Sequence, residues 1–156
     1  MQQKETTNPE DLSAVPLEGR IIAIDPGKKR IGVAVCDESR IVVSPLPIVP
    51  RASWKKLLTK IRDILIEFDA VGLVVGLPYN FDGTESEMSS EARKLARNFA
   101  LSLDIPVFLQ DERATTYEAR GKLWRRGLAN AELAKTLDSE AAAIILSDFL
   151  DRASES

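Results

Sequence analysis

The sequence predicts a single α/β domain in which an antiparallel meander of three strands joins parallel strands in one mixed sheet, with helices packed on it. Three observations support this fold class. Short apolar, β-branched runs come first along the chain, and helical and strand patterns alternate after them. The 156 residues are enough for one core of ordinary size. With 44% hydrophobic and 29% charged residues, the composition is that of a globular protein.

The first three expected strands form the meander. Arg20–Asp25 and Arg30–Cys36 are apolar runs separated by a turn that begins with Pro-Gly, which indicates a β-hairpin. Ile41–Val49 continues as a third strand. Because Pro45 and Pro47 carry no N–H to donate to a ladder, this strand is expected at the edge of the sheet.

Helices and strands then alternate. Apolar residues at helical spacing follow a Ser53 cap, and Val71–Val75 is an apolar strand of the kind buried inside a parallel sheet. A capping box formed by Thr84 and Glu87 begins a helix that runs to about Leu103. Pro106–Gln110 is the next strand.

Two more helices complete the predicted order. Thr115 and Glu118 repeat the capping-box spacing, and Gly127 can end the helix that they begin. A turn near Asn130–Lys135 is expected to precede the last helix, Ser139–Leu150.

The predicted boundaries assign residues 1–18 to a flexible N-terminal extension, 19–151 to the single domain and 152–156 to a C-terminal tail. The extension is polar and acidic, unlike a signal peptide, and no apolar run is long enough to cross a bilayer. We therefore expect a cytoplasmic protein. The lone Cys36 lies in an apolar run, is expected to be buried, and excludes a disulfide within one chain.

The chain contains no histidine, so it lacks the commonest general base and the imidazole ligand of zinc, copper and iron sites. Carboxylates, hydroxyls, Lys, Arg or a hard metal ion must supply any chemistry. The net charge of −3 is unfavourable for a protein that binds nucleic acid, although local basic patches matter more than the sum.

Four acids stand where predicted elements begin or end. Asp25 ends the first strand, Asp111 and Glu112 follow Pro106–Gln110, and Asp138 begins the last helix. Each also has a structural interpretation. Asp25 could be a turn residue, Asp111 and Glu112 a solvated charge cluster, and Asp138 a helix cap. Since successive residues of a strand point to opposite faces, only one of Asp111 and Glu112 is expected to share a face with Asp25.

Ends of elements are where open α/β sheets gather their sites, so these acids are candidates for one cluster. Carboxylates brought together raise one another's pKa unless a divalent cation neutralises them. Oxygen ligands without His or Cys select Mg²⁺ or Mn²⁺. Such a cluster suits phosphodiester hydrolysis, in which metals activate water and stabilise the leaving oxygen.

The motifs resemble those of the YqgF (RuvX) family, in the same order along residues 20 to 150. They are Ile24-Asp25-Pro26-Gly27 with Arg30-Ile31-Gly32-Val33-Ala34, Val74-Val75-Gly76-Leu77-Pro78, Asn80-Phe81-Asp82-Gly83-Thr84, Asp111-Glu112-Arg113 with Thr115-Thr116 and Glu118-Ala119, and Asp138 with Ala141-Ala142-Ala143-Ile144-Ile145-Leu146.

The resemblance implies an RNase H-like fold and a metal-dependent endonuclease of the Holliday junction resolvase and pre-16S rRNA nuclease kind. It implies catalytic, Mg²⁺- or Mn²⁺-binding acids at Asp25, Glu112 and Asp138, with Asp111 an adjoining acid. Ribosomal RNA precursor, in a ribosomal precursor particle, and branched DNA both remain open as substrates. The sequence does not select an oligomeric state.

Basic and polar residues near these motifs are candidates for substrate binding, with solvated surface as the alternative. They are Lys28, Lys29, Arg30, Asn80, Arg113, Arg120, Arg125 and Arg126.

Two other functions share the predicted fold. One is a nucleotide-binding protein of the actin and sugar-kinase type, but those proteins need two lobes and this chain has the length of one, with no Walker-type glycine pattern. The other is a module that binds nucleic acid without cleaving it. Acids at all three positions argue against that second alternative.

Overall fold

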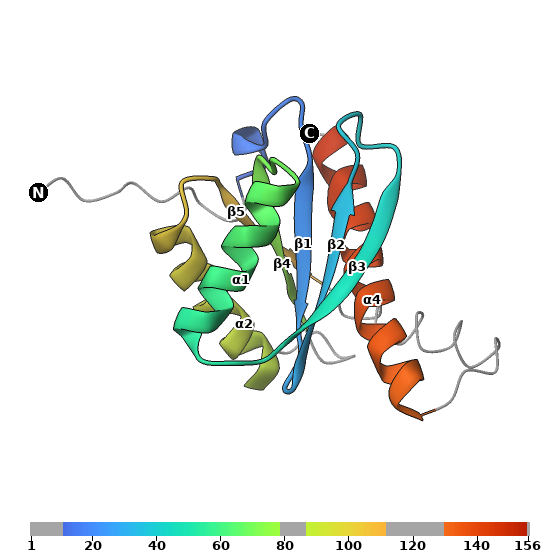
Figure 1. Cartoon of the computed structure of the whole chain (residues 1–156). Helices are drawn as coiled ribbons and strands as arrows, with labels where there is room; N and C mark the ends of the chain where they lie inside the picture. The colour runs from blue at the N-terminus through green and yellow to red at the C-terminus, as the bar shows by residue number, and fades with distance from the viewer. Residues whose placement is uncertain (1–10, 79–86, 112–129, 156) are drawn as a thin grey trace, which may run out of the picture.

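The computed structural model describes residues 11–78, 87–111 and 130–155, with side chains from Ser139 onward in the last range. Its centre is a five-stranded sheet in the order β3-β2-β1-β4-β5 (Figure 1). β1 (Ile21–Pro26), β2 (Arg30–Cys36) and β3 (Val43–Pro50) form the antiparallel meander. β4 (Gly72–Leu77) lies parallel to β1, and β5 (Val107–Asp111) parallel to β4. The predicted mixed sheet and the edge position of the proline-containing strand are confirmed.

Helices cover both faces of the sheet. Figure 1 shows α1 (Trp54–Glu67) and α2 (Glu87–Ser102) on one side and α4 (Asn130–Ser154) on the other. Ser53 caps α1 as predicted, because its hydroxyl accepts a hydrogen bond from the Lys56 N–H at 3.4 Å. Among the described residues, no helix is long and apolar enough to cross a membrane.

Side-chain alternation along the strands divides the core into two layers. One layer, here called the α2 face, joins Ile22, Ile24, Leu73, Val75, Leu77, Val107 and Leu109 to α1 and α2. The second, the α4 face, joins Ile21, Ala23, Val74 and Phe108 to Ala142, Ile145, Leu146 and Phe149 of α4. Cys36 is also buried there, as predicted.

The last helix differs from the prediction. A turn was expected near Asn130–Lys135, before a helix Ser139–Leu150, but α4 is continuous from Asn130 to Ser154. The segment contains no Gly or Pro and is rich in Ala, Glu, Leu and Lys, so nothing in it interrupts a helix. Asp138 therefore lies inside α4 and not at its start.

Part of the stretch predicted as a flexible extension is packed. A short 3-10 helix, η1 (Leu12–Ala14), is capped by Asp11, whose carboxylate accepts the Ser13 N–H at 3.0 Å. Leu12, Ala14 and Val15 lie partly buried against the α4 face. These apolar side chains hold the chain against the sheet before β1 begins.

Candidate functional site

The carboxyl ends of β1, β4 and β5 meet at one edge of the sheet, the lower edge in Figure 1. Ile24 is paired with Val75, and Val75 with Leu109. One residue further along each strand, Asp25, Gly76 and Gln110 therefore occupy one row across the sheet. Asp111 pairs with Leu77 and ends β5. With strands about 4.8 Å apart, the β1 and β5 backbones are separated by about 10 Å at this edge.

The two described acids of this edge belong to opposite faces. Asp25 follows Ala23 by two residues and so has the register of the α4 face. Asp111 follows Leu109 by two residues and has the register of the α2 face. Asp25 is half-buried, whereas Asp111 is exposed. Only one acid of the Asp111–Glu112 pair was expected to share a face with Asp25. Asp111 is not that acid, because it has the register of the α2 face.

Gly76 determines how closely α4 approaches this row. A Cβ atom at Gly76 would lie 2.5 Å from the Ile145 Cδ1 atom and 3.4 Å from the Ile24 carbonyl oxygen. Any larger residue would force Ile145 to shift. The Val-Gly-Leu-Pro motif at the end of β4 therefore has a packing role, because its glycine lets α4 pack closely against the sheet in the row of Asp25.

By helical periodicity, position 138 has the register of the stripe of α4 that covers the sheet. The positions three, four and seven residues later are Ala141, Ala142 and Ile145, all of which are buried. The next residue, Ser139, donates a hydrogen bond from its hydroxyl to the Leu46 carbonyl of β3 at 2.8 Å. Asp138 is about two turns inside α4, so the alternative that it caps the helix is wrong.

Several predicted site residues lie outside the described residues or side chains. They are Asn80, Glu112, Arg113, Arg120, Arg125 and Arg126, together with the side chain of Asp138. Within the side chains that the structure describes, which include Asp25 and Asp111, no group of three or more acids or cysteines is placed to hold a metal ion. Asp25 and position 138 of α4 share the α4 face by register, and both residues offer only oxygen donors. Oxygen donors of this kind suit a hard cation.

The predicted basic residues of the first hairpin lie beside Asp25. Lys28 and Lys29 are exposed in the β1–β2 turn, and Arg30 begins β2. The turn is tight: the Gly27 N–H donates to the Arg30 carbonyl at 2.9 Å. A Cβ atom at Gly27 would lie 2.5 Å from that same carbonyl oxygen, so the position requires glycine.

Two residues at this edge were missed by the sequence analysis. Arg51 follows β3, and its guanidinium donates to the Gly27 carbonyl at 3.0 Å. Gln110 is 8% exposed in the row of Asp25, and its Oε1 atom has no hydrogen-bond partner among the described atoms. Only the strand register brings either residue to the site, because neither belongs to a recognisable motif.

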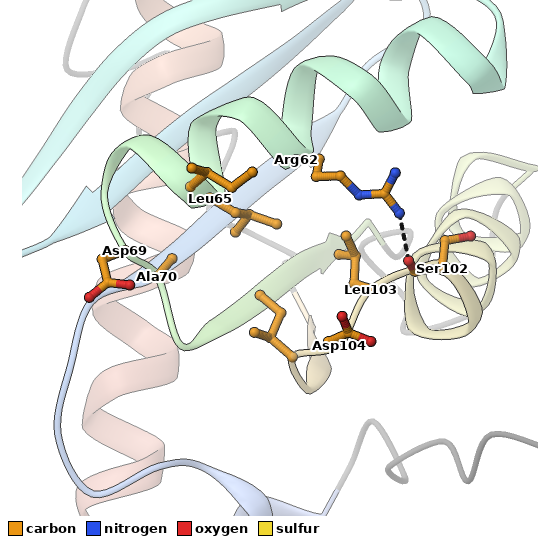
Figure 2. A pocket seen from close by; sticks show the side chains of 9 residues that line it. Arg62, Leu65, Asp69, Ala70, Ser102, Leu103 and Asp104 are labelled. Atoms are coloured by element: carbon orange, nitrogen blue, oxygen red, sulfur yellow. Dashed lines mark hydrogen bonds between the residues drawn. The ribbon is translucent and has the colours of Figure 1, made fainter.

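The opposite edge of the sheet holds the hollow of about 340 Å³ drawn in Figure 2. It lies where α1 and α2 end, at the amino ends of β4 and β5, and its wall includes Leu65, Asp69 and Asp104. Arg62 on its rim donates to the Ser102 carbonyl at 2.8 Å. The hollow is therefore separated from Asp25 by the length of the strands.

Comparison with known proteins identifies the family. The RuvX family model, described as Holliday junction resolvase, matches residues 19–152. The chain belongs to the RuvX family. The resemblance drawn from its motifs is thereby confirmed.

Relatives of the RuvX chain match it over nearly its whole length. A Cereibacter sphaeroides protein named "Putative pre-16S rRNA nuclease" is 37% identical over 143 residues, which are 92% of this chain and 89% of the relative. A protein of the same name from Anaeromyxobacter sp. is 38% identical over 133 residues, 85% of this chain and 97% of the relative.

Solved structures confirm the RNase H-like fold class. Thermus thermophilus RuvC in complex with a Holliday junction substrate matches with a TM-score of 0.52 and 18% identity, covering 85% of this chain and 95% of RuvC. A second Thermus thermophilus RuvC structure matches with a TM-score of 0.51 and 15% identity, covering 86% and 96%.

Proposed function

We propose that this RuvX protein is an endonuclease that hydrolyses phosphodiester bonds in the precursor of 16S ribosomal RNA, in the cytoplasm and on a ribosomal precursor particle. The relatives, which are 37% and 38% identical over the aligned residues, carry the name "Putative pre-16S rRNA nuclease". Register supports the location of the site: by strand alternation and helical periodicity, Asp25 and position 138 of α4 fall on the same face of the sheet.

The proposed site is built from Asp25, Glu112 and Asp138. Alternation assigns Asp111 to the α2 face, so we assign the inner acid of the pair to Glu112. These three carboxylates would hold Mg²⁺ or Mn²⁺, which supplies an activated water and charge neutralisation at the cleaved phosphate. Asp111, exposed at the end of β5, is left outside the metal-binding set.

The chain's other residues bind and orient the substrate in this proposal. Lys28 and Lys29 carry positive charge within four residues of Asp25 and can contact the phosphates that flank the cleaved bond. Gly76 and Ile145 hold α4 at a defined height over Asp25. The absence of histidine from the chain removes the commonest side-chain base and is consistent with metal-activated water as the nucleophile.

A four-way DNA junction is the second candidate substrate. It is favoured by the family description and by the fold shared with RuvC, which is bound to a Holliday junction in one of the matching structures. Both substrates are branched or folded nucleic acids with clustered phosphates, which suits a site at the rim of a sheet.

The test compares a 16S rRNA precursor with a synthetic four-way junction, in Mg²⁺ and in Mn²⁺. We expect the wild-type protein to cleave the RNA precursor, and Asp25→Asn, Glu112→Gln and Asp138→Asn each to abolish cleavage without unfolding. Asp63→Asn, at an exposed position on α1, is the matched control and should remain active. Cleavage of the junction alone would move the assignment to DNA, and full activity in the three acid variants would contradict the site.

A further inference from the structure

Arg51 connects the end of β3 to the turn between β1 and β2. Its backbone N–H donates to the Lys29 carbonyl at 2.9 Å, and its guanidinium Nη1 donates to the Gly27 carbonyl at 3.0 Å. One residue therefore holds the turn at both ends. Neither the motifs nor the family description assigns it a role.

The turn that Arg51 holds joins the strand of Asp25 to the basic residues. Asp25 pairs with Gly32, the next pair closes the ladder, and the Gly27 N–H bond to Arg30 forms the turn itself. Lys28 and Lys29 are the exposed residues at its tip. A displacement of the turn would move both ammonium groups relative to Asp25.

The guanidinium of Arg51 also faces α2. Its Nη2 atom lies 3.7 Å from the Glu91 carboxylate, and the two side chains are 27% and 56% exposed. An ion pair this exposed is weak and leaves the arginine held mainly by its bonds to the turn. The contact places the negative charge of Glu91 close to the turn.

We propose that Arg51 is a positioning residue for substrate binding: it fixes the β1–β2 turn so that Lys28 and Lys29 meet the phosphates of a nucleic-acid strand passing Asp25. Arg51 acts through the two lysines and does not itself touch the reacting phosphate. The inference rests on the proposed function, because it requires a nucleic-acid substrate at this edge.

The physical reason is preorganisation. Long lysine side chains on a mobile turn must be ordered when they bind phosphate, and that ordering weakens binding. If Arg51, at the end of β3, already orders the turn, less conformational entropy is lost when the lysines bind phosphate. Arg51 should therefore affect affinity for the substrate far more than the rate of the chemical step.

The test measures the dissociation constant for a labelled 16S rRNA precursor fragment in Ca²⁺, a hard cation used here in place of Mg²⁺ to limit cleavage. Arg51→Met keeps the aliphatic stem and the backbone bond to Lys29 but removes the guanidinium. The matched control is Arg62→Met, which removes the same charge and a similar bond to a carbonyl at the opposite edge. We expect Arg51→Met to weaken binding by about 3- to 10-fold and Arg62→Met by less than about twofold.

A variant cycle separates positioning from general charge. In a Lys28→Ala, Lys29→Ala background, Arg51→Met should have little further effect, since the groups it positions are gone. Equal effects of Arg51→Met and Arg62→Met, or a full additional loss in that background, would overturn the inference. Absence of any RNA binding by the wild-type protein would instead overturn the proposed function together with it.

Glu91→Gln gives an independent measurement that leaves the Arg51 bonds to the turn in place. Removing the carboxylate 3.7 Å from the guanidinium raises the positive potential around the turn, so binding should tighten modestly. Weaker binding by this variant would contradict the arrangement, even if Arg51→Met failed to fold.

Discussion

Replacing Gly76 with alanine should push α4 away from the sheet beside Asp25. The new Cβ atom would lie 2.5 Å from Ile145 Cδ1 and 3.4 Å from Ile145 Cγ1 and from the Ile24 carbonyl oxygen. Ile145 is 1% exposed, so it has little free space into which it can turn. The overlap must be relieved by a shift of the helix or by an unfavourable side-chain rotamer.

The expected cost follows from these contacts. Overpacking of a dense core costs about 1 to 3 kcal/mol. Alanine in a strand recovers about 0.5 to 1 kcal/mol of backbone entropy relative to glycine. The net loss of unfolding free energy for Gly76→Ala is therefore about 0 to 2.5 kcal/mol, and cleavage should fall because α4 carries Asp138.

A second substitution tests the mechanism of that loss. Ile145→Val removes the Cδ1 atom and should cost about 0.5 to 1.5 kcal/mol by itself. In the double variant the alanine methyl occupies the vacated space, so the combined loss should be smaller than the sum by about 1 kcal/mol. Gly72→Ala is the matched control in the same strand, because its Cβ would lie 3.7 Å from the nearest atom, in ordinary contact.

Urea titration provides the measurement. The urea midpoints of the variants can be compared provided that the slope of the unfolding free energy against urea concentration does not change. The expected order of stability places Gly72→Ala above Gly76→Ala, and Ile145→Val should cost less in the Gly76→Ala background than in the wild-type protein. If Gly76→Ala were as stable as Gly72→Ala, or if the two losses simply added, the close approach of α4 at Gly76 would be refuted.

Three further predictions concern single positions. Gly27→Ala places a Cβ 2.5 Å from the Arg30 carbonyl, so it should lower thermal stability by about 1 to 3 kcal/mol and reduce cleavage; an unchanged melting curve would show that the turn is looser than described. Burial raises the pKa of the Cys36 thiol above its value in the unfolded chain. Above a pH of about 8.5 the unfolded chain loses this proton before the folded protein does, so stability should fall as the pH rises towards the folded-state pKa. Cys36→Ala should reduce this dependence of stability on pH, and identical pH profiles for the variant and the wild-type protein would contradict the prediction. Asp25→Asn should raise the melting temperature in EDTA by relieving carboxylate repulsion and should reduce the shift caused by Mg²⁺; the opposite signs in a thermal-shift assay would argue against a shared cation.

Sequence periodicity predicted most of the fold because the strands and α1 carry simple patterns. The boundary of β3 shows where such patterns end: Ile41 and Val42 extend the β-branched run, yet the strand begins at Val43. Both of their N–H groups donate to the Asp37 carboxylate, at 2.8 and 2.9 Å, which holds them in the preceding turn. A side-chain acceptor four and five residues away outweighs the local strand preference.

The candidate site could be predicted only in part. The motifs carry Asp25, the Asp111–Glu112 pair and Asp138, and strand alternation separates the inner acid from the outer one. Two other roles depend on contacts between residues far apart in the chain. Gly76 leaves room for Ile145, and Arg51 donates a hydrogen bond to the β1–β2 turn. Periodicity within one segment contains no information on such contacts.

Binding of Mn²⁺, followed by electron paramagnetic resonance without substrate, tests the central claim most directly. The proposed site predicts that Asp25→Asn, Glu112→Gln and Asp138→Asn each weaken Mn²⁺ binding by at least about tenfold, since loss of a ligand should cost no less than loss of a supporting residue. Asp111→Asn, on the α2 face, should retain the wild-type affinity. Strong loss in Asp111→Asn with full binding in Glu112→Gln, or unchanged binding in all four proteins, would contradict a metal site on the α4 face of this edge.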